Sequence, residues 1–117
     1  MTSRAVGVRG EEIAAAYLQS RGFLLLAAHY QIRGAEIDLI AQDGAYRVFV
    51  EVKYRTDTHF SMPREAVTCA KQRRICRAAL RWLTEQGRTE DYVRFDVVEV
   101  TPMGVTHWPN AFDAPYG

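Results

Sequence analysis

The chain has 117 residues, of which 48% are hydrophobic and 25% are charged, and its formal net charge is +1. This length fits a single domain over residues 1–117 with one modest core, and the near-neutral charge excludes a globally basic nucleic-acid-binding protein. We expect no signal peptide and no membrane span, because the longest apolar run covers only residues 23–28.

The first predicted elements are one helix and three strands. Apolar residues at helical spacing predict a helix over residues 4–21, which Gly22 is suited to end. Alternating or continuous apolar residues predict strands over residues 23–30, 36–42 and 45–54.

Glu11 is unusual because it lies on the apolar face of the first helix, the face that packs on the sheet. Gly7 and Gly10 remove side chains beside it and permit a close approach of this helix. A glutamate on such a face is unfavourable unless it is paired or binds a metal. Alternatively, Glu11 only interacts with the positive end of the helix dipole.

The dipeptide Asp43-Gly44 predicts a two-residue turn between the second and third strands. A two-residue turn fixes the register of a hairpin, because it determines which residues face each other. The pairs expected from this register are Gln42–Ala45, Asp38–Phe49 and Glu36–Glu51.

This hairpin separates charged from apolar residues, because side chains alternate between the two faces of a strand. The charged face carries Glu36, Asp38, Glu51 and Lys53, and the apolar face carries Ile37, Leu39, Val48, Val50 and Val52. Carboxylates this close repel each other, and a bound cation would remove the repulsion. Alternatively, the charged face is solvated and pairs Glu with Lys across the strands. The role of Glu36 stays open.

Asp38 and Glu51 therefore predict a site for Mg²⁺ or Mn²⁺, since these cations bind through one or two carboxylates and keep several waters. The strands that carry both residues are strongly apolar, which favours a half-buried site over a solvated face. Lys53 stands beside Glu51, where its amine can orient a water or stabilise the charge of a phosphate.

A second helix is predicted from Pro63 to Gln86, with Ser61 or Met62 near its cap and Gly87 after its end. Its apolar spacing defines one stripe that faces the core. The stripe consists of Val67, Ile75, Ala78, Ala79 and Trp82.

The two cysteines, Cys69 and Cys76, lie seven residues apart in this helical stretch. That spacing is about two turns of helix, too far for an easy disulfide bond. No further Cys or His accompanies them at the spacing of a zinc site. We expect free thiols in a reducing cytoplasm.

Basic residues cover much of the remaining surface of the second helix. Arg74, Arg77 and Arg81 form one stripe, and Lys71 lies on the core side, from which it can reach the carboxylates. Arg55 adds a cation near the hairpin. A cationic stripe beside a metal site suits a phosphodiester substrate. Alternatively, the stripe is a solvated helix face.

Two more strands are predicted, over residues 92–101 and about 104–108, with an irregular segment from Pro109. The order α-β-β-β-α-β-β predicts an α/β fold with a mixed central sheet flanked by two helices. The histidines show no metal-ligand spacing, and we expect surface or loop positions for His29, His59 and His107.

These residues together resemble a known family. Asp38, followed after twelve residues by Glu51-x-Lys53 and preceded by a helix with Glu11, resembles the PD-(D/E)XK nuclease core. More closely, nearly the whole chain resembles the YraN-like family of small bacterial predicted endonucleases, akin to archaeal Holliday-junction resolvases. The matching segments are Gly10-Glu11, Glu36-Ile37-Asp38-Leu39-Ile40, Phe49-Val50-Glu51-Val52-Lys53, Arg55, Pro63, Glu65-Ala66-Val67, Lys71, Arg94-Phe95-Asp96-Val97 and Asn110-Ala111-Phe112.

The resemblance implies a restriction-endonuclease-like fold and a Mg²⁺- or Mn²⁺-dependent endonuclease that hydrolyses structured or branched DNA. It implies Lys53 as the catalytic lysine, and it matches Lys71 to a lysine of the family's second helix. The metal ligands that it implies are Asp38, Glu51, the Val52 carbonyl oxygen and Glu11. A non-catalytic nucleic-acid-binding module or adaptor on the same fold is the alternative. By analogy with the resolvases, which act as symmetric dimers, we expect a homodimer.

Three positions depart from the family pattern. His29 replaces a usual Asn, Ala35 replaces the Gly before Glu36, and Ser61 replaces a Gly in the loop before Pro63. None of them removes a proposed metal ligand. The two lost glycines alter the expected loop shapes, and with them the fit of a substrate.

Overall fold

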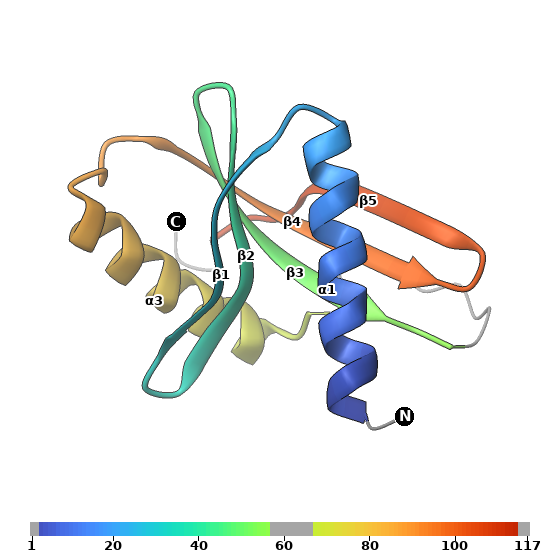
Figure 1. Ribbon diagram of the computed structural model, residues 1–117. Helices are drawn as coiled ribbons and strands as arrows, with labels where there is room; N and C mark the ends of the chain where they lie inside the picture. Colours follow the sequence, from blue (N-terminus) through green and yellow to red (C-terminus); the bar gives the residue numbers. More distant parts are fainter. Residues whose placement is uncertain (1–2, 57–66, 115–117) are drawn as a thin grey trace.

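The structure, a computed structural model, describes residues 3–56 and 67–114 and consists there of two helices and one five-stranded sheet (Figure 1). The chain order is α-β-β-β-α-β-β, which confirms the predicted α/β fold. The elements are α1 (Ser3–Ser20), β1 (Leu24–Ile32), β2 (Ala35–Asp43), β3 (Tyr46–Tyr54), α3 (Cys69–Gln86), β4 (Tyr92–Thr101) and β5 (Gly104–Phe112).

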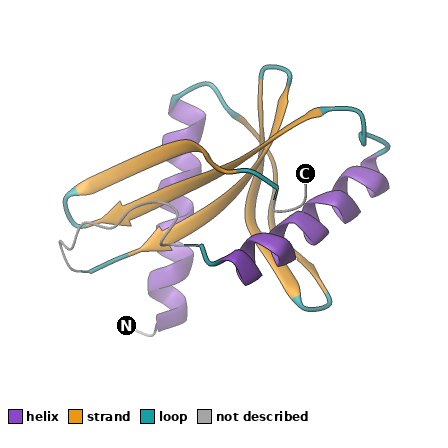
Figure 2. Cartoon of the chain, turned by 180° about the vertical axis from the view of Figure 1, so that it is seen from behind, coloured by secondary structure: helices purple, strands orange, loops and turns teal. Residues whose placement is uncertain are grey.

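The five strands lie side by side in the order in which they occur in the chain. β3 and β4 are parallel, and every other neighbouring pair is antiparallel. Parallel neighbours need a crossover connection, and the segment with α3 provides it. α1 covers one face of the sheet and α3 covers the other, as Figure 2 shows from behind.

Each face of the sheet has its own hydrophobic cluster. On the α3 side, Phe49 packs against Trp82 and Phe95, with ring centroids 5.9 Å and 5.8 Å apart. On the α1 side, Leu18 and Val50 are completely or almost completely buried. The stripe predicted to face the core is confirmed, since all five of its residues are buried.

The helix α3 begins later than predicted. Thr68 is its N-cap, and the Thr68 hydroxyl accepts a hydrogen bond from the Lys71 backbone N–H. Val67 is therefore buried ahead of the helix and not inside it. Pro63 and the caps predicted near it, Ser61 or Met62, lie outside the described residues.

The hairpin between β2 and β3 has a different register from the predicted one. Asp43 pairs with Tyr46, so the turn consists of Gly44 and Ala45, with Gly44 at a φ of 58°. The pairings predicted from an Asp43-Gly44 turn are wrong. Asp43 stays in the strand because its carboxylate accepts a hydrogen bond from Arg94 on β4, at 3.0 Å.

The observed register changes the strand neighbours of the two predicted ligands, Asp38 and Glu51. Leu39 pairs with Val50 and Ile40 with Phe49, so Asp38 and Glu51 are the residues that follow the last pair of this ladder. Each residue keeps its face, because the new partner is two residues away from the predicted one.

Ile37 is an exception to the predicted apolar face. The pairing of β2 with β3 begins at Leu39, and the earlier part of β2 pairs with β1 alone. Ile37 packs in the α3-side cluster, together with Ala35. The strand therefore changes the face that it buries on either side of Asp38.

β5 is longer than predicted and includes the segment from Pro109 that was expected to be irregular. It pairs Trp108 with Val97 and Phe112 with Phe95, which leaves a bulge between the two pairs. Asn110 lies in that bulge at a φ of 52° and donates its backbone N–H to Asp96. The bulge accommodates a proline, which has no N–H for a regular ladder.

Both cysteines have free thiols, as predicted; Cys69 is exposed and Cys76 is buried. Neither of the helices in residues 3–56 and 67–114 is long and apolar enough to span a membrane.

Candidate metal centre

Three carboxylates from three different elements come together at the β2–β3 hairpin. Glu11 comes from α1, Asp38 from β2 and Glu51 from β3. The Asp38 carboxyl lies within hydrogen-bonding reach of both of the others. The structure therefore brings together the three acidic ligands that the sequence predicted.

Asp38 is held by the backbone of the neighbouring strand. The Val52 N–H donates to Asp38 Oδ2 at 2.8 Å. Burial raises the pKa of Asp38 to about 6; the Val52 N–H opposes this increase, and the Glu11 charge adds to it. Val52, whose carbonyl oxygen is a predicted ligand, thus already contacts the site through its N–H.

Glu51 is the most enclosed of the three carboxylates, with a side chain that is 7% exposed. Burial and the Asp38 charge raise the pKa of Glu51 to about 7, although Lys71 acts in the opposite direction. Lys71 Nζ, from the first turn of α3, donates a hydrogen bond to Glu51 Oε1. The prediction that Lys71 reaches the carboxylates is confirmed.

Glu11 completes the cluster from the helix side. Burial raises its pKa, and the imidazole of His29 opposes this increase. His29 Nε2 lies 2.8 Å from Glu11 Oε2, yet the angles make no hydrogen bond, and this buried oxygen has no hydrogen-bond partner among the described residues.

Gly10 explains how α1 comes close enough to place Glu11 there. A Cβ atom at Gly10 would lie 3.0 Å from Cδ2 and 3.2 Å from Cβ of Tyr54 on β3. These distances are shorter than ordinary van der Waals contacts. The predicted close approach of the helix at Gly10 is therefore present.

His29 is a member of the site that sequence reasoning missed. It lies on β1, is about half exposed, and places its Nδ1 3.8 Å from Glu36 Oε1. Its φ of 53° is in the left-handed region, which Asn tolerates better than most residues do. The replacement of a usual Asn by His29 was the available signal, because it marked a backbone position of this kind.

Lys53 lies on the same strand face as Glu51 and is half-buried. The amine that binds Glu51 is nevertheless that of Lys71. In the described part of the chain, no hydrogen bond or ion pair joins Lys53 to a carboxylate of the cluster.

The predicted nucleic-acid-binding residues divide into two groups. Lys71 and Arg74 line a cleft of about 270 Å³ between α3 and the turn that joins β1 to β2. The other three contact groups outside this cleft's carboxylates: Arg77 contacts the Arg33 carbonyl, Arg81 contacts Glu85 and Arg55 contacts Glu99. The cleft also includes Glu36, so it opens next to the carboxylates.

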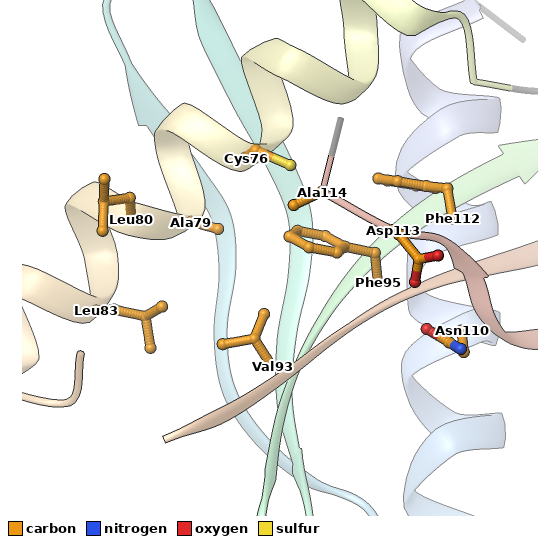
Figure 3. Close-up of a pocket in the computed structure, with 10 residues that line it drawn as sticks. All are labelled: Cys76, Ala79, Leu80, Leu83, Val93, Phe95, Asn110, Phe112, Asp113 and Ala114. Atoms are coloured by element: carbon orange, nitrogen blue, oxygen red, sulfur yellow. The ribbon is translucent and has the colours of Figure 1, made fainter. Parts of the chain in front are cut away.

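A second cavity, of about 220 Å³, lies between α3, the start of β4 and the end of β5 (Figure 3). Its walls are mostly apolar and include Leu83, Val93, Phe95 and Phe112. None of the three carboxylates lines it, so it is separate from the candidate site.

A second polar cluster, on the α1 face of the sheet, is structural. Asp96 is completely buried and accepts hydrogen bonds from Arg94 at 2.9 and 3.0 Å, while His107 Nε2 lies 2.8 Å from its carboxylate. Burial would raise the pKa of Asp96, but the hydrogen bonds from His107 and Arg94 hold it below its ordinary value. The surface or loop position predicted for His107 is wrong, since it lies on β5 with a side chain that is 10% exposed, and His59 lies outside the described residues.

The described residues contain no group of three or more His, Cys, Asp or Glu side chains already arranged around a metal position. The Asp38 carboxyl instead lies within hydrogen-bonding reach of the carboxyls of Glu11 and Glu51, an arrangement that protons favour because they offset the charge. Their oxygen donors suit a hard divalent cation, and Glu11 Oε2, which lies against His29 Nε2, accepts no hydrogen bond from the described residues. The donor set therefore fits Mg²⁺ or Mn²⁺.

Comparison with known proteins places this geometry in a family. The family model described as "Uncharacterised protein family UPF0102" matches residues 10–100. A UPF0102 protein of Geobacter metallireducens is 42% identical over 97% of both chains. A UPF0102 protein of Symbiobacterium thermophilum is 50% identical over 86% of this chain and 85% of its own, and one of Nocardia farcinica is 46% identical over 83% and 76%.

Proposed function

This chain belongs to the UPF0102 family, which is YraN-like, and from that premise we propose that it is a divalent-metal-dependent endonuclease. The observation that carries the proposal is the meeting of Glu11, Asp38 and Glu51, with raised pKa values, beside the Lys71 amine. Clustered carboxylates whose pKa values are raised by burial are typical of functional sites.

Glu11, Asp38 and Glu51 would hold the cation, together with the Val52 carbonyl oxygen. A bound Mg²⁺ or Mn²⁺ supplies positive charge to a phosphoryl oxygen and lowers the pKa of a water. Lys53, on the same face of β3 as Glu51, is proposed as the catalytic lysine that orients that water or stabilises the phosphate charge.

The proposed substrate is nucleic acid, with structured or branched DNA suggested by the resemblance to resolvases. Lys71 and Arg74 support a polyanionic substrate because they line a cleft beside the carboxylates. We also propose a homodimer, for which the same resemblance is the support; sedimentation at high protein concentration tests it, and a strict monomer would contradict it.

The activity is tested with purified protein, Mn²⁺ and a branched or flapped DNA. Glu51→Ala is expected to abolish nicking, because it removes a central ligand, while circular dichroism shows that the fold is kept. Glu11→Gln should also lose activity, and Glu12→Gln, an exposed neighbour on the same helix, should keep it. Wild-type rates in Glu51→Ala would refute the proposal.

A non-catalytic nucleic-acid-binding module is the second candidate, favoured by the absence of a preformed metal cluster among the described side chains. It predicts salt-sensitive DNA binding that is lost on replacing Arg74, Arg77 and Arg81 and does not depend on metal. Calorimetry with Mn²⁺ separates the two candidates. A heat of Mn²⁺ binding that disappears in Asp38→Asn supports the metal-dependent enzyme. The absence of any binding heat at millimolar Mn²⁺ supports the non-catalytic module.

A further inference from the structure

Lys71 acts as a built-in counter-ion of the candidate metal centre. Its ammonium group donates to one oxygen of Glu51, and its charge lowers the pKa of both Glu51 and Asp38. The carboxylates that would bind a divalent cation are therefore already partly neutralised by a side chain of the same protein.

The two partners of this ion pair differ in their freedom to move. The Glu51 side chain is 7% exposed and belongs to a strand with a neighbour on each side, whereas the Lys71 side chain is 39% exposed. Lysine is a flexible four-carbon chain. Breaking the pair therefore moves the lysine and leaves the carboxylate in place.

The released ammonium group has a second position available. Lys71 lines the cleft between α3 and the β1–β2 turn, which Arg74 and Glu36 also line. A rotation about its own side-chain bonds is enough to direct Lys71 into that cleft. In the cleft, Lys71 and Arg74 lie one helical turn apart and present two cations to one anion.

We propose that a divalent cation displaces Lys71 from Glu51, and that the released Lys71 then binds a nucleic-acid phosphate in the cleft together with Arg74. This inference rests on the proposed function. The cation and the ammonium group compete for one carboxylate oxygen, since two positive charges this close repel each other. Cation binding and phosphate binding then strengthen each other by the same factor.

The first experiment measures Mn²⁺ affinity by electron paramagnetic resonance for the wild-type protein and for Lys71→Met. Removing the competitor is expected to tighten binding about tenfold, a typical coupling between two bound groups. Arg73→Met is the matched control, because it removes the same charge from an exposed position on the same helix. Its affinity should change by less than about twofold, because solvent screens exposed charges.

Thermal unfolding confirms that the Lys71→Met variant is folded, and Lys71→Gln provides a second neutral side chain in case it is not. Wild-type protein that binds Mn²⁺ no more weakly than both Lys71 variants overturns the competition and leaves the proposed metal centre standing. A wild-type protein that binds no Mn²⁺ at millimolar concentration overturns both the competition and the proposed metal centre.

The second experiment measures the binding of a fluorescent DNA oligonucleotide in EDTA. Glu51→Gln should release Lys71 without any cation and bind the oligonucleotide more tightly than Glu36→Gln, which removes a carboxyl group that lines the same cleft. The double variant Glu51→Gln/Lys71→Met should lose this gain. Equal gains in the two single variants overturn the release of Lys71.

Discussion

The clustered carboxyl groups of Glu11, Asp38 and Glu51 hold less negative charge at neutral pH than three carboxylates in water would. Burial raises the pKa of Asp38 to about 6 and that of Glu51 to about 7, and it also raises the pKa of Glu11. A divalent cation would replace the retained protons, so metal affinity and pH are linked through these groups.

The metal-free protein is expected to become more stable as the pH falls from about 8 to about 5. Asp38 and Glu51 have higher pKa values when folded than the ordinary values of about 4 that apply when unfolded. Between these values the folded state binds more protons, so the free energy of unfolding decreases as the pH rises through this window. Urea denaturation in EDTA at several pH values across this range measures the free energy of unfolding.

Glu51→Gln is the control for this pH dependence, because it removes a carboxyl whose pKa is raised to about 7 and should flatten the profile. Saturating Mn²⁺ should stabilise the protein more at high pH, where the ligands are deprotonated. A wild-type profile that is already flat in EDTA would mean that these carboxyls do not retain protons in the fold.

Two helices, one on each face of the sheet, supply the partners of the strand carboxylates. α1 brings Glu11 to the cluster because Gly10 has no side chain to collide with Tyr54. α3 brings Lys71 to Glu51 from the opposite face, and Arg77 ties the same helix to the β1–β2 turn through the Arg33 carbonyl. The site is thus assembled by helix packing on a hairpin.

Gly10→Val should separate α1 from β3 and weaken Mn²⁺ binding. The added side chain meets Tyr54 at a distance that forces a displacement, so the free energy of unfolding should fall by about 1–3 kcal/mol. Denaturant unfolding and Mn²⁺ titration measure the two effects. Ala16→Val, at an exposed position of α1, controls for the β-branched side chain; unchanged Mn²⁺ affinity in Gly10→Val would exclude Glu11 as a ligand.

For the molecule as a whole, the net charge is only +1, and its cationic side chains lie in different surroundings. Arg94 is bound to Asp43 and Asp96, and Arg55 forms an ion pair with Glu99. Lys71 and Arg74 instead line the cleft beside the candidate site. Attraction for nucleic acid is therefore expected to come from a small local surface.

DNA binding should accordingly depend only moderately on salt. Two phosphate contacts, by Lys71 and Arg74, predict a slope of about −2 for the logarithm of the binding constant against the logarithm of salt concentration. Fluorescence anisotropy at several salt concentrations, with Ca²⁺ present to avoid cleavage, measures this slope. A slope steeper than about −4 would indicate a wider basic surface than this cleft.

Local patterns in the chain were enough to predict the element order and the acidic residues of the site. Asp38 and Glu51 were assigned to one face because side chains alternate with a period of two, and the wrong pairing, which was shifted by two residues, left this assignment unchanged. Glu11 was identifiable because helical periodicity places it on the buried face.

The partners of these carboxylates depended on three-dimensional packing. Lys71 lies twenty residues after Glu51, on a helix whose approach to the sheet is a property of the assembled core and not of a local pattern. Helical periodicity predicted that Lys71 lies on the core side of the helix, but its contact with Glu51 could be seen only in the packed structure. His29 and the Asp96 network escaped prediction for the same reason, since their contacts join residues that no short-range spacing relates.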